Sequence, residues 1–202
     1  MKKVPGQKTI NDEDTGLINA INSGQKSLFH DLVKKYEQRL YNFGLRMCNE
    51  TRDAEDMVQE TFLNVYRYLP DFRYEASFKN WLYRIASSAC IKKKRKSKFA
   101  PQKEISLEDF IPEDKENIPD SLPSWASKPL DKVLNDELSE NIRKAILSLP
   151  EKYRVVLVLR DIEGFDTKET AQILNIKPTS VKVRLHRARL FVKEKLKDYF
   201  AA

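Results

Sequence analysis

The chain has 202 residues, 41% of them apolar, which is enough for one or two small domains with cores of their own. Its 37 Lys and Arg exceed its 30 Asp and Glu, and the net charge of +7 indicates a polyanionic partner, although such a surplus is also common on ordinary surfaces. Two isolated cysteines and two histidines argue against a disulfide framework and a metal site, and no apolar run reaches membrane-spanning length. Because the N-terminus also lacks a signal-peptide core, the sequence predicts a cytoplasmic protein without a metal or cofactor.

A helical pattern begins after a predicted tail at residues 1–10. Asn11 or Asp12 could cap a short helix that ends near Asn22, and Gly24 separates it from the next one. In the following segment, residues 25–48, apolar side chains recur every three or four positions, which predicts a long helix with one buried stripe. The members of this stripe are Leu28, Leu32, Tyr36, Leu40, Phe43 and Met47.

The stretch at residues 52–98 combines an acidic helix, an aromatic loop and a basic helix. The acidic helix could be capped by Asn49 or Thr51 and ends at Pro70, and its core positions are Val58, Phe62, Val65 and Leu69. The loop then carries Phe72, Arg73 and Tyr74. The next helix ends in the basic cluster KKKRKSK, and its apolar face consists of Phe78, Trp81, Leu82, Ile85 and Ala89. Aromatic rings stack on unpaired bases while Lys and Arg follow phosphates, so this unit suits single-stranded nucleic acid held beside a partner protein.

A change in composition separates this domain from the C-terminal one. Residues 99–131 contain eight acids against three Lys, hold five of the nine prolines and show no helical period. Such a segment cannot close a core, so we expect a linker at residues 99–130 between domains at residues 11–98 and 131–202. The sequence therefore predicts an all-α protein of two small helical domains joined by an acidic, Pro-rich linker.

The C-terminal domain is predicted to end in a helix-turn-helix. The stripe of its first helix ends at Pro150 and consists of Leu134, Leu138, Ile142, Ile146 and Leu149. A second helix follows through Asp161; its run VVLVL could form a strand, but helical neighbours and the lack of a pairing strand favour a helix. Asp166 or Thr167 then caps a short helix, with Glu169 in the capping-box position. A turn at residues 175–178 leads to a final basic helix.

The final helix carries eight Lys or Arg against one Glu between Lys177 and Lys197. Alone it would fit a solvated amphipathic helix whose buried face is Val181, Leu185, Ala188 and Val192. Because a short partner helix precedes it, DNA binding is the favoured interpretation. The first turns of such a helix enter the major groove, and the side chains that could reach bases are Thr179, Ser180, Lys182, Val183, Arg184, His186 and Arg187. The side chains expected to meet phosphates are Lys177, Arg189 and Lys193.

Two segments of the chain resemble one known family. DMVQETFLNVYRYL with the following FR-x-E-A-S-F-x-x-WLYRIA resembles the second conserved region of bacterial sigma-70-type transcription initiation factors, in the extracytoplasmic-function (ECF) group. LPEKYRVVLVLRDIEGFDTKETAQILNI with SVKVRLHRAR resembles their fourth conserved region, which reads the minus-thirty-five promoter element and contacts the polymerase flap. Three positions, Ser88, Thr179 and Val183, depart from the residues common in the family, and the first and last bear on which promoter is read.

The resemblance implies a transcription initiation factor that binds core RNA polymerase and promoter DNA, with an anti-sigma factor as its regulator. Residues that fall where the family touches the polymerase clamp helices are Asp53, Asp56, Gln59, Glu60 and Phe62. Acidic residues there would equally suit a solvated N-terminal turn. Residues that fall near the unpaired minus-ten strand are Phe72, Tyr74, Lys79, Asn80, Tyr83, Arg84 and Ser88, beside Lys92 and Lys93 of the basic cluster. Trp81 fits either the core or the strand, and the linker is either a plain tether or is threaded through the polymerase, as in the family.

Two other classes of function explain less of the sequence. A helix-turn-helix regulator would account for residues 131–202 only and would leave the aromatic loop without a role. An enzyme is disfavoured, because the sequence has no phosphate loop among its five glycines, no Cys-His pair and no carboxylate cluster in an apolar setting. We therefore expect no small-molecule substrate and no direct contact with a membrane.

Overall fold

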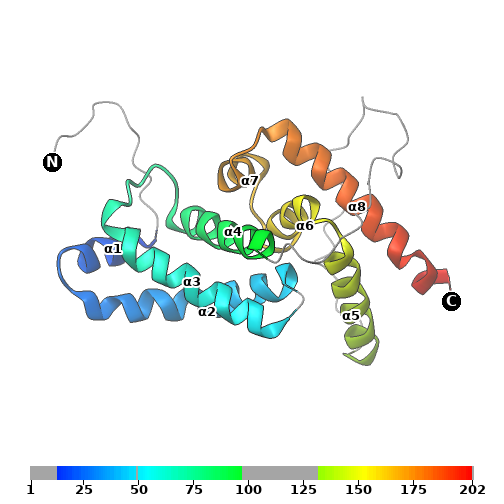
Figure 1. The fold of residues 1–202 in the computed structure, drawn as a ribbon, viewed down its shortest axis with the longest axis horizontal. Helices are drawn as coiled ribbons and strands as arrows, with labels where there is room; N and C mark the ends of the chain where they lie inside the picture. The colour runs from blue at the N-terminus through cyan, green and yellow to red at the C-terminus, as the bar shows by residue number, and fades with distance from the viewer. Residues whose placement is uncertain (1–12, 49, 97–131, 202) are drawn as a thin grey trace.

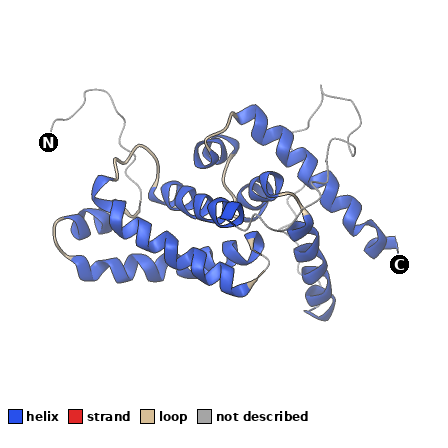
Figure 2. Ribbon diagram, in the orientation of Figure 1, coloured by secondary structure: helices blue, strands red, loops and turns tan. Residues whose placement is uncertain are grey.

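The computed structural model describes residues 13–48, 50–96 and 132–201, and every regular element in these ranges is a helix (Figure 1 and Figure 2). The N-terminal half contains α1 (Thr15–Asn22), η1 (Lys26–Leu28), α2 (Phe29–Met47), α3 (Thr51–Tyr68), η2 (Leu69–Asp71) and α4 (Phe78–Lys96). The C-terminal half contains α5 (Lys132–Ser148), α6 (Glu151–Leu157), the π-helical segment η4 (Val158–Ile162), α7 (Thr167–Leu174) and α8 (Pro178–Ala201). The all-α prediction is confirmed, while the predicted tail and linker lie outside the described residues.

The N-terminal half is a bundle built around the apolar stripe of α2. The predicted stripe is confirmed, because Leu28 is partly buried and the fully buried members are Leu32, Tyr36, Leu40, Phe43 and Met47. Helices α2 and α3 are in close contact at Gly44, where an added Cβ would lie 2.7 Å from Met57 Cε and 3.0 Å from Ala54 Cβ. A side chain at this position would therefore crowd α3.

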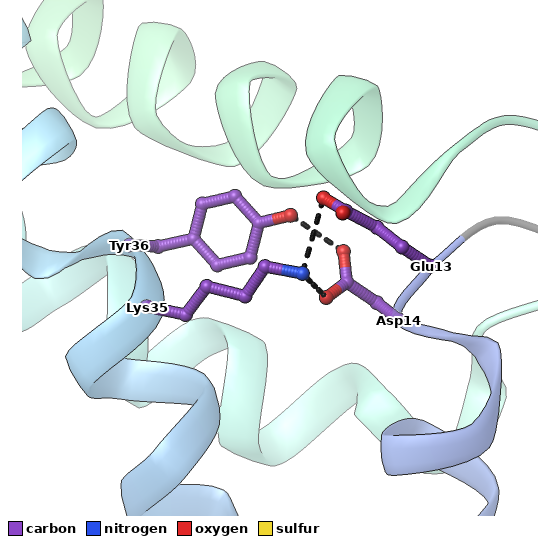
Figure 3. Close-up of polar contacts among 4 residues, drawn as sticks. All are labelled: Glu13, Asp14, Lys35 and Tyr36. Carbon is purple, nitrogen blue, oxygen red and sulfur yellow. Dashed lines mark hydrogen bonds and ion pairs between the residues drawn. The ribbon is translucent and has the colours of Figure 1, made fainter.

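A buried carboxylate holds the start of α1 against α2 (Figure 3). The Tyr36 hydroxyl donates to Asp14 Oδ2 at 2.5 Å, and Lys35 Nζ donates to Asp14 Oδ1 at 2.6 Å and lies 3.1 Å from Glu13 Oε1. Burial lowers the pKa of Lys35, but its bonds to Asp14 and Glu13 outweigh this and leave that pKa above the ordinary value. Since α1 begins at Thr15, the predicted start after Asn11 or Asp12 is not seen, and both those residues lie outside the described ranges.

The start of α3 also differs from the sequence prediction. Thr51 is the first residue of the helix, so it is not the cap; the preceding Glu50 is extended and makes no side-chain cap bond. Asn49, the alternative cap, lies outside the described residues. The predicted end is confirmed, because α3 stops at Tyr68 and Pro70 lies in η2.

The C-terminal half contains the predicted helix-turn-helix. The run VVLVL lies in α6 and η4 with all five side chains buried, so the helical interpretation is confirmed. Asp166 Oδ1 accepts from Glu169 N and Glu169 Oε2 accepts from Asp166 N, both at 2.8 Å, which is the predicted capping box at the start of α7. Asn175, with a left-handed φ of 52°, ends α7 and turns the chain into α8.

The two halves are docked on one another through a shared apolar core. In Figure 1, α4 lies beside α7, and the contacts also join α2 to α6. Arg154 of α6 is 3% exposed; it donates to Met47 O of α2 at 2.8 Å, to Leu149 O at 2.8 Å and to Leu147 O. This buried guanidinium therefore satisfies carbonyl groups at the ends of two helices, one in each half.

Candidate polymerase and nucleic-acid interfaces

The first turns of α8 present a basic face to solvent. Lys177, Thr179, Lys182 and Val183 are exposed, and the half-buried candidates beside them are Ser180, Arg184, His186 and Arg187. The opposite face is the predicted one: Val181, Leu185, Ala188 and Val192 are all buried. Val183 is 37% exposed and is an apolar side chain among polar ones. Such a face can hydrogen-bond base edges and also touch a thymine methyl group.

Arg189 does not lie on this exposed face. Its Nε and Nη2 donate to the two carboxylate oxygens of Asp161 at 2.8 and 2.6 Å. Its hydrogen bond to Asp161 raises the pKa of Arg189, against the opposing effect of burial. The pair joins α8 to η4, so the structure gives Arg189 a packing role, whereas the sequence suggested a phosphate contact.

The outward face of α3 gathers most of the predicted polymerase-binding residues. Asp56, Gln59 and Glu60 are exposed and Asp53 is half-buried, but Phe62 is only 8% exposed and packs in the core. The apolar residue on this face is instead Leu63, at 68% exposure. Leu63 follows Asp56, Gln59 and Glu60 by seven, four and three residues, so helical spacing could have identified it.

The loop between α3 and α4 is ordered by ring contacts. The Phe72 ring lies 4.8 Å from Tyr74 and 5.0 Å from Trp81, and Trp81 lies 5.8 Å from Phe78. Phe72 is 9% exposed, so in this structure it is a packing residue. Tyr74 has a left-handed φ of 57°, a conformation costly for a bulky residue, and its hydroxyl donates to Asn19 Oδ1 at 2.7 Å.

One face of α4 is covered by the C-terminal half. The Tyr83 hydroxyl donates to Glu163 Oε2 at 2.6 Å, and Arg46 Nη1 lies 3.8 Å from Glu163 Oε1. Lys79 Nζ donates to the Glu163 carbonyl at 3.4 Å and lies 4.4 Å from the centre of the Phe165 ring, which packs edge-on against Tyr83. Burial and the Glu163 charge raise the pKa of Tyr83 well above its ordinary value, so the phenol keeps the proton that it donates.

Asn80 belongs to the same covered face. It is 7% exposed, and its Nδ2 donates to Glu169 Oε1 at 3.3 Å. Glu169 is also the capping-box residue of α7, so the helix-turn-helix and α4 share this carboxylate. Three of the residues predicted to lie near an unpaired strand, Lys79, Asn80 and Tyr83, are therefore in contact with the C-terminal half.

The other face of α4 opens into a groove against α3. It has a volume of about 260 Å³, and its lining includes Glu60 and Tyr68 of α3 with Trp81, Arg84 and Ser88 of α4. Ser88 and Arg84 are exposed, and the Ser88 hydroxyl donates to the Arg84 carbonyl at 2.9 Å. Trp81 packs against Phe72 and Phe78 and also lines the groove. The structure is therefore compatible with both alternatives for this residue, a core position and a strand contact. The side chains of Lys92 and Lys93 lie outside the described residues.

The two thiols of the chain both lie in the N-terminal half. Both cysteines are free; Cys48 is half-buried just after α2, and Cys90 is buried in α4. A hydrogen bond with Cys48, together with burial, raises the pKa of Cys90. Within the described ranges, no three His, Cys, Asp or Glu residues gather as a metal site, and no helix has the length and apolar character to cross a membrane.

Comparison with known proteins matches each half of the chain to a region of one protein family. The family model "Sigma-70 region 2" matches residues 32–99, and "Sigma-70, region 4" matches residues 139–192. The ECF RNA polymerase sigma factor SigW of Bacillus subtilis is 33% identical over 183 residues, covering 90% of this chain and 95% of the relative. The ECF RNA polymerase sigma-E factor of Haemophilus influenzae is 30% identical over 185 residues, covering 91% and 95%.

Two solved structures share the fold. CnrH in complex with the cytosolic domain of CnrY superposes with a TM-score of 0.65 at 22% identity, covering 93% of this chain and 99% of the other. The sigma factor RpoE in complex with the anti-sigma factor NepR, from Bartonella quintana, superposes with a TM-score of 0.60 at 22% identity, covering 84% and 96%. The helix-turn-helix, the two matched regions and the full-length relatives define a sigma-70-type factor. The chain belongs to the ECF group of RNA polymerase sigma factors and is a transcription initiation factor.

Proposed function

We propose that this sigma factor uses three faces for three tasks in initiation. The outward face of α3 binds core RNA polymerase, the first turns of α8 read duplex DNA at the minus-thirty-five element, and α4 with its preceding loop takes the unpaired minus-ten strand. The observation that carries the proposal is the helix-turn-helix, whose second helix exposes Thr179, Lys182 and Val183, with Lys177 just before it, in a chain that matches both sigma-70 regions.

The DNA-reading face is tested by removing two of its cations. Lys182→Ala with Arg184→Ala should abolish selectivity for the upstream element in transcription with core polymerase, since each base-edge contact contributes about 1–3 kcal/mol of discrimination. Assembly with the polymerase should not change. Lys197→Ala is the control, because Lys197 lies near the far end of α8, is 70% exposed and pairs with Glu194. Selectivity that survives in the double variant would make this helix a structural element.

The proposed polymerase-binding face of α3 carries the exposed Leu63 beside the acidic residues Asp56 and Glu60. An apolar side chain surrounded by charges is the pattern of a protein interface, and the acids would meet a basic surface on the polymerase. Glu60→Lys should weaken association with core polymerase by about 2–5 kcal/mol if the contact is buried on binding. Glu37→Lys, an exposed reversal on α2, is the matched control. Equal affinity of both variants and wild type would remove α3 from the interface.

The groove between α3 and α4 is suited to an unpaired base. Trp81 offers an aromatic ring, Arg84 a cation and Ser88 a hydroxyl, while Glu60 disfavours a phosphate inside the groove. Arg84→Ala should leave closed complexes intact but reduce the permanganate-reactive open complex, and a pre-melted bubble should restore transcription. Lys34→Ala on α2 controls for the lost charge. Normal opening by the Arg84 variant would exclude this groove.

The proposal includes regulation by an anti-sigma protein. One solved relative with this fold was determined with an anti-sigma factor, and the other with the cytosolic domain of a second protein. A partner of the same class would act on this chain by covering the faces that meet polymerase. A protein that co-purifies with the chain should therefore compete with core polymerase for it, and simultaneous binding of both would argue against this mode of regulation.

A further inference from the structure

The contacts between α4 and the C-terminal half converge on one short turn, residues 163–165, which follows η4. Glu163 accepts from Tyr83 through its side chain and from Lys79 through its carbonyl, and its carboxylate faces Arg46. The side chain of Glu163 is only 11% exposed. The turn therefore fills a site on the N-terminal half that is lined by one phenol and two cations.

The same site has the chemistry that binds a nucleotide. A phosphate would accept from the Tyr83 hydroxyl and pair with Arg46, which is what the Glu163 carboxylate does. A base would stack near Tyr83 and Lys79, where the Phe165 ring lies 4.8 Å from the Tyr83 ring and 4.4 Å from the Lys79 ammonium. Carboxylate and ring are joined through Gly164, whose left-handed φ of 77° allows the tight turn between them.

We infer that the turn at residues 163–165 stands in for a nucleotide on the face of α4 that carries Lys79, Asn80 and Tyr83, so that this face of the free factor is closed to single strands until the turn withdraws. This inference rests on the proposed role of α4 in holding the unpaired strand. It also explains why Lys79, Asn80 and Tyr83 are covered here, while the groove residues Arg84 and Ser88 remain open. A strand and the C-terminal half compete for one surface.

If single strands bind only to molecules in which the turn has withdrawn from α4, here called open, the apparent affinity equals the intrinsic affinity multiplied by the fraction of open molecules. If about one molecule in ten is open, releasing the turn raises the affinity for single strands about tenfold, which corresponds to about 1.4 kcal/mol. The effect requires no change in the residues that hold the strand. Substitution of Glu163, which lies in the C-terminal half, should therefore be enough to raise the affinity for single strands.

The test measures binding of a fluorescent single-stranded oligothymidylate to the full-length chain without polymerase. Glu163→Arg places a cation beside Arg46 and Lys79 and should raise the affinity about tenfold above its control. The control is Glu194→Arg, which makes the same charge change in the same half. The ion pair of Glu194 is with Lys197, three residues further along α8, so it does not join the two halves. Glu163→Gln, which keeps the shape of the side chain, should give a smaller rise over Glu194→Gln.

Small-angle X-ray scattering and circular dichroism of the same proteins separate the outcomes. Expansion with unchanged helix content and higher affinity than the control supports the inference. If the Glu163 variants neither expand nor bind the oligonucleotide more tightly than their controls, only the inference is overturned, because Glu163 would not be needed to hold the turn against α4. Expansion without a gain in affinity overturns both the inference and the strand-binding role of this α4 face, while the α3 and α8 assays remain independent.

Discussion

Replacing Arg154 should destabilise the protein more than any surface substitution. Its guanidinium is buried and donates to the carbonyl groups of Met47, Leu147 and Leu149. Burial lowers the pKa of Arg154, partly offset by the negative charge of Glu151, but the ordinary pKa of a guanidinium lies so far above neutral pH that the group stays protonated. The structure thus pairs a buried cation with carbonyl ends of two helices.

The size of the effect follows from what the substitution leaves behind. Arg154→Ala deprives three carbonyls of a donor, at about 1–3 kcal/mol for each that stays dry. Water entering the space would satisfy some of them, so we expect a loss of about 3–5 kcal/mol. Arg154→Lys keeps the charge but not the planar fork of donors, and it should lose less than Arg154→Ala.

Urea unfolding followed by circular dichroism measures these differences. Arg143→Ala is the control, because Arg143 is 39% exposed and its contact is a 3.5 Å pair with Glu140 one turn away. Such a pair contributes at most about 0.5 kcal/mol. If Arg154→Ala cost no more than Arg143→Ala, the carbonyls would be satisfied without the guanidinium, and Arg154 would not stabilise these helix ends.

Three further substitutions test other parts of the fold by the same unfolding measurement. Gly44→Ala should cost about 1–3 kcal/mol, because the new methyl group would overlap Met57 Cε in the α2–α3 contact, and a neutral result would show that the Met57 side chain or α3 can shift. Tyr36→Phe should cost about 1.5–3 kcal/mol through the lost bond to the buried Asp14 carboxylate, and unchanged stability would make that bond dispensable. Asp166→Ala should cost about 1 kcal/mol by removing the cap of α7, with Asp166→Asn retaining most of it.

Local patterns predicted most of the secondary structure. The stripe of α2, the helical state of VVLVL and the capping box at Asp166 depend on residues a few positions apart, and the structure confirms each. The start of α1 was predicted after Asn11 or Asp12, whereas the helix begins at Thr15. The preceding Asp14 makes no side-chain cap bond, and its carboxylate contacts Lys35 and Tyr36 of α2, a long-range contact that no local pattern signals.

The candidate sites were harder to predict, because their residues also pack against distant parts of the chain. Periodicity places Phe62 in the core stripe of α3 and Leu63 outside it, yet the family pattern alone pointed to Phe62 as a docking residue. The contact of Tyr83 with Glu163 spans 80 residues, and no local pattern signals it. Arg154 carries a weak signal, since a charge next to the apolar run VVLVL needs a partner when it is buried.

Four charged side chains of α6, η4 and the turn that follows differ in what they would lose if the halves separated: Arg154, Arg160, Asp161 and Glu163. Arg160 donates to the Phe165 carbonyl and Asp161 pairs with Arg189, so both contacts lie within the C-terminal half. Arg154 would lose one of its three carbonyl partners and keep two. Glu163 alone directs its carboxylate wholly to the N-terminal half. Because a buried charge needs a partner, Glu163 is the one of these four charges whose environment would change most on opening.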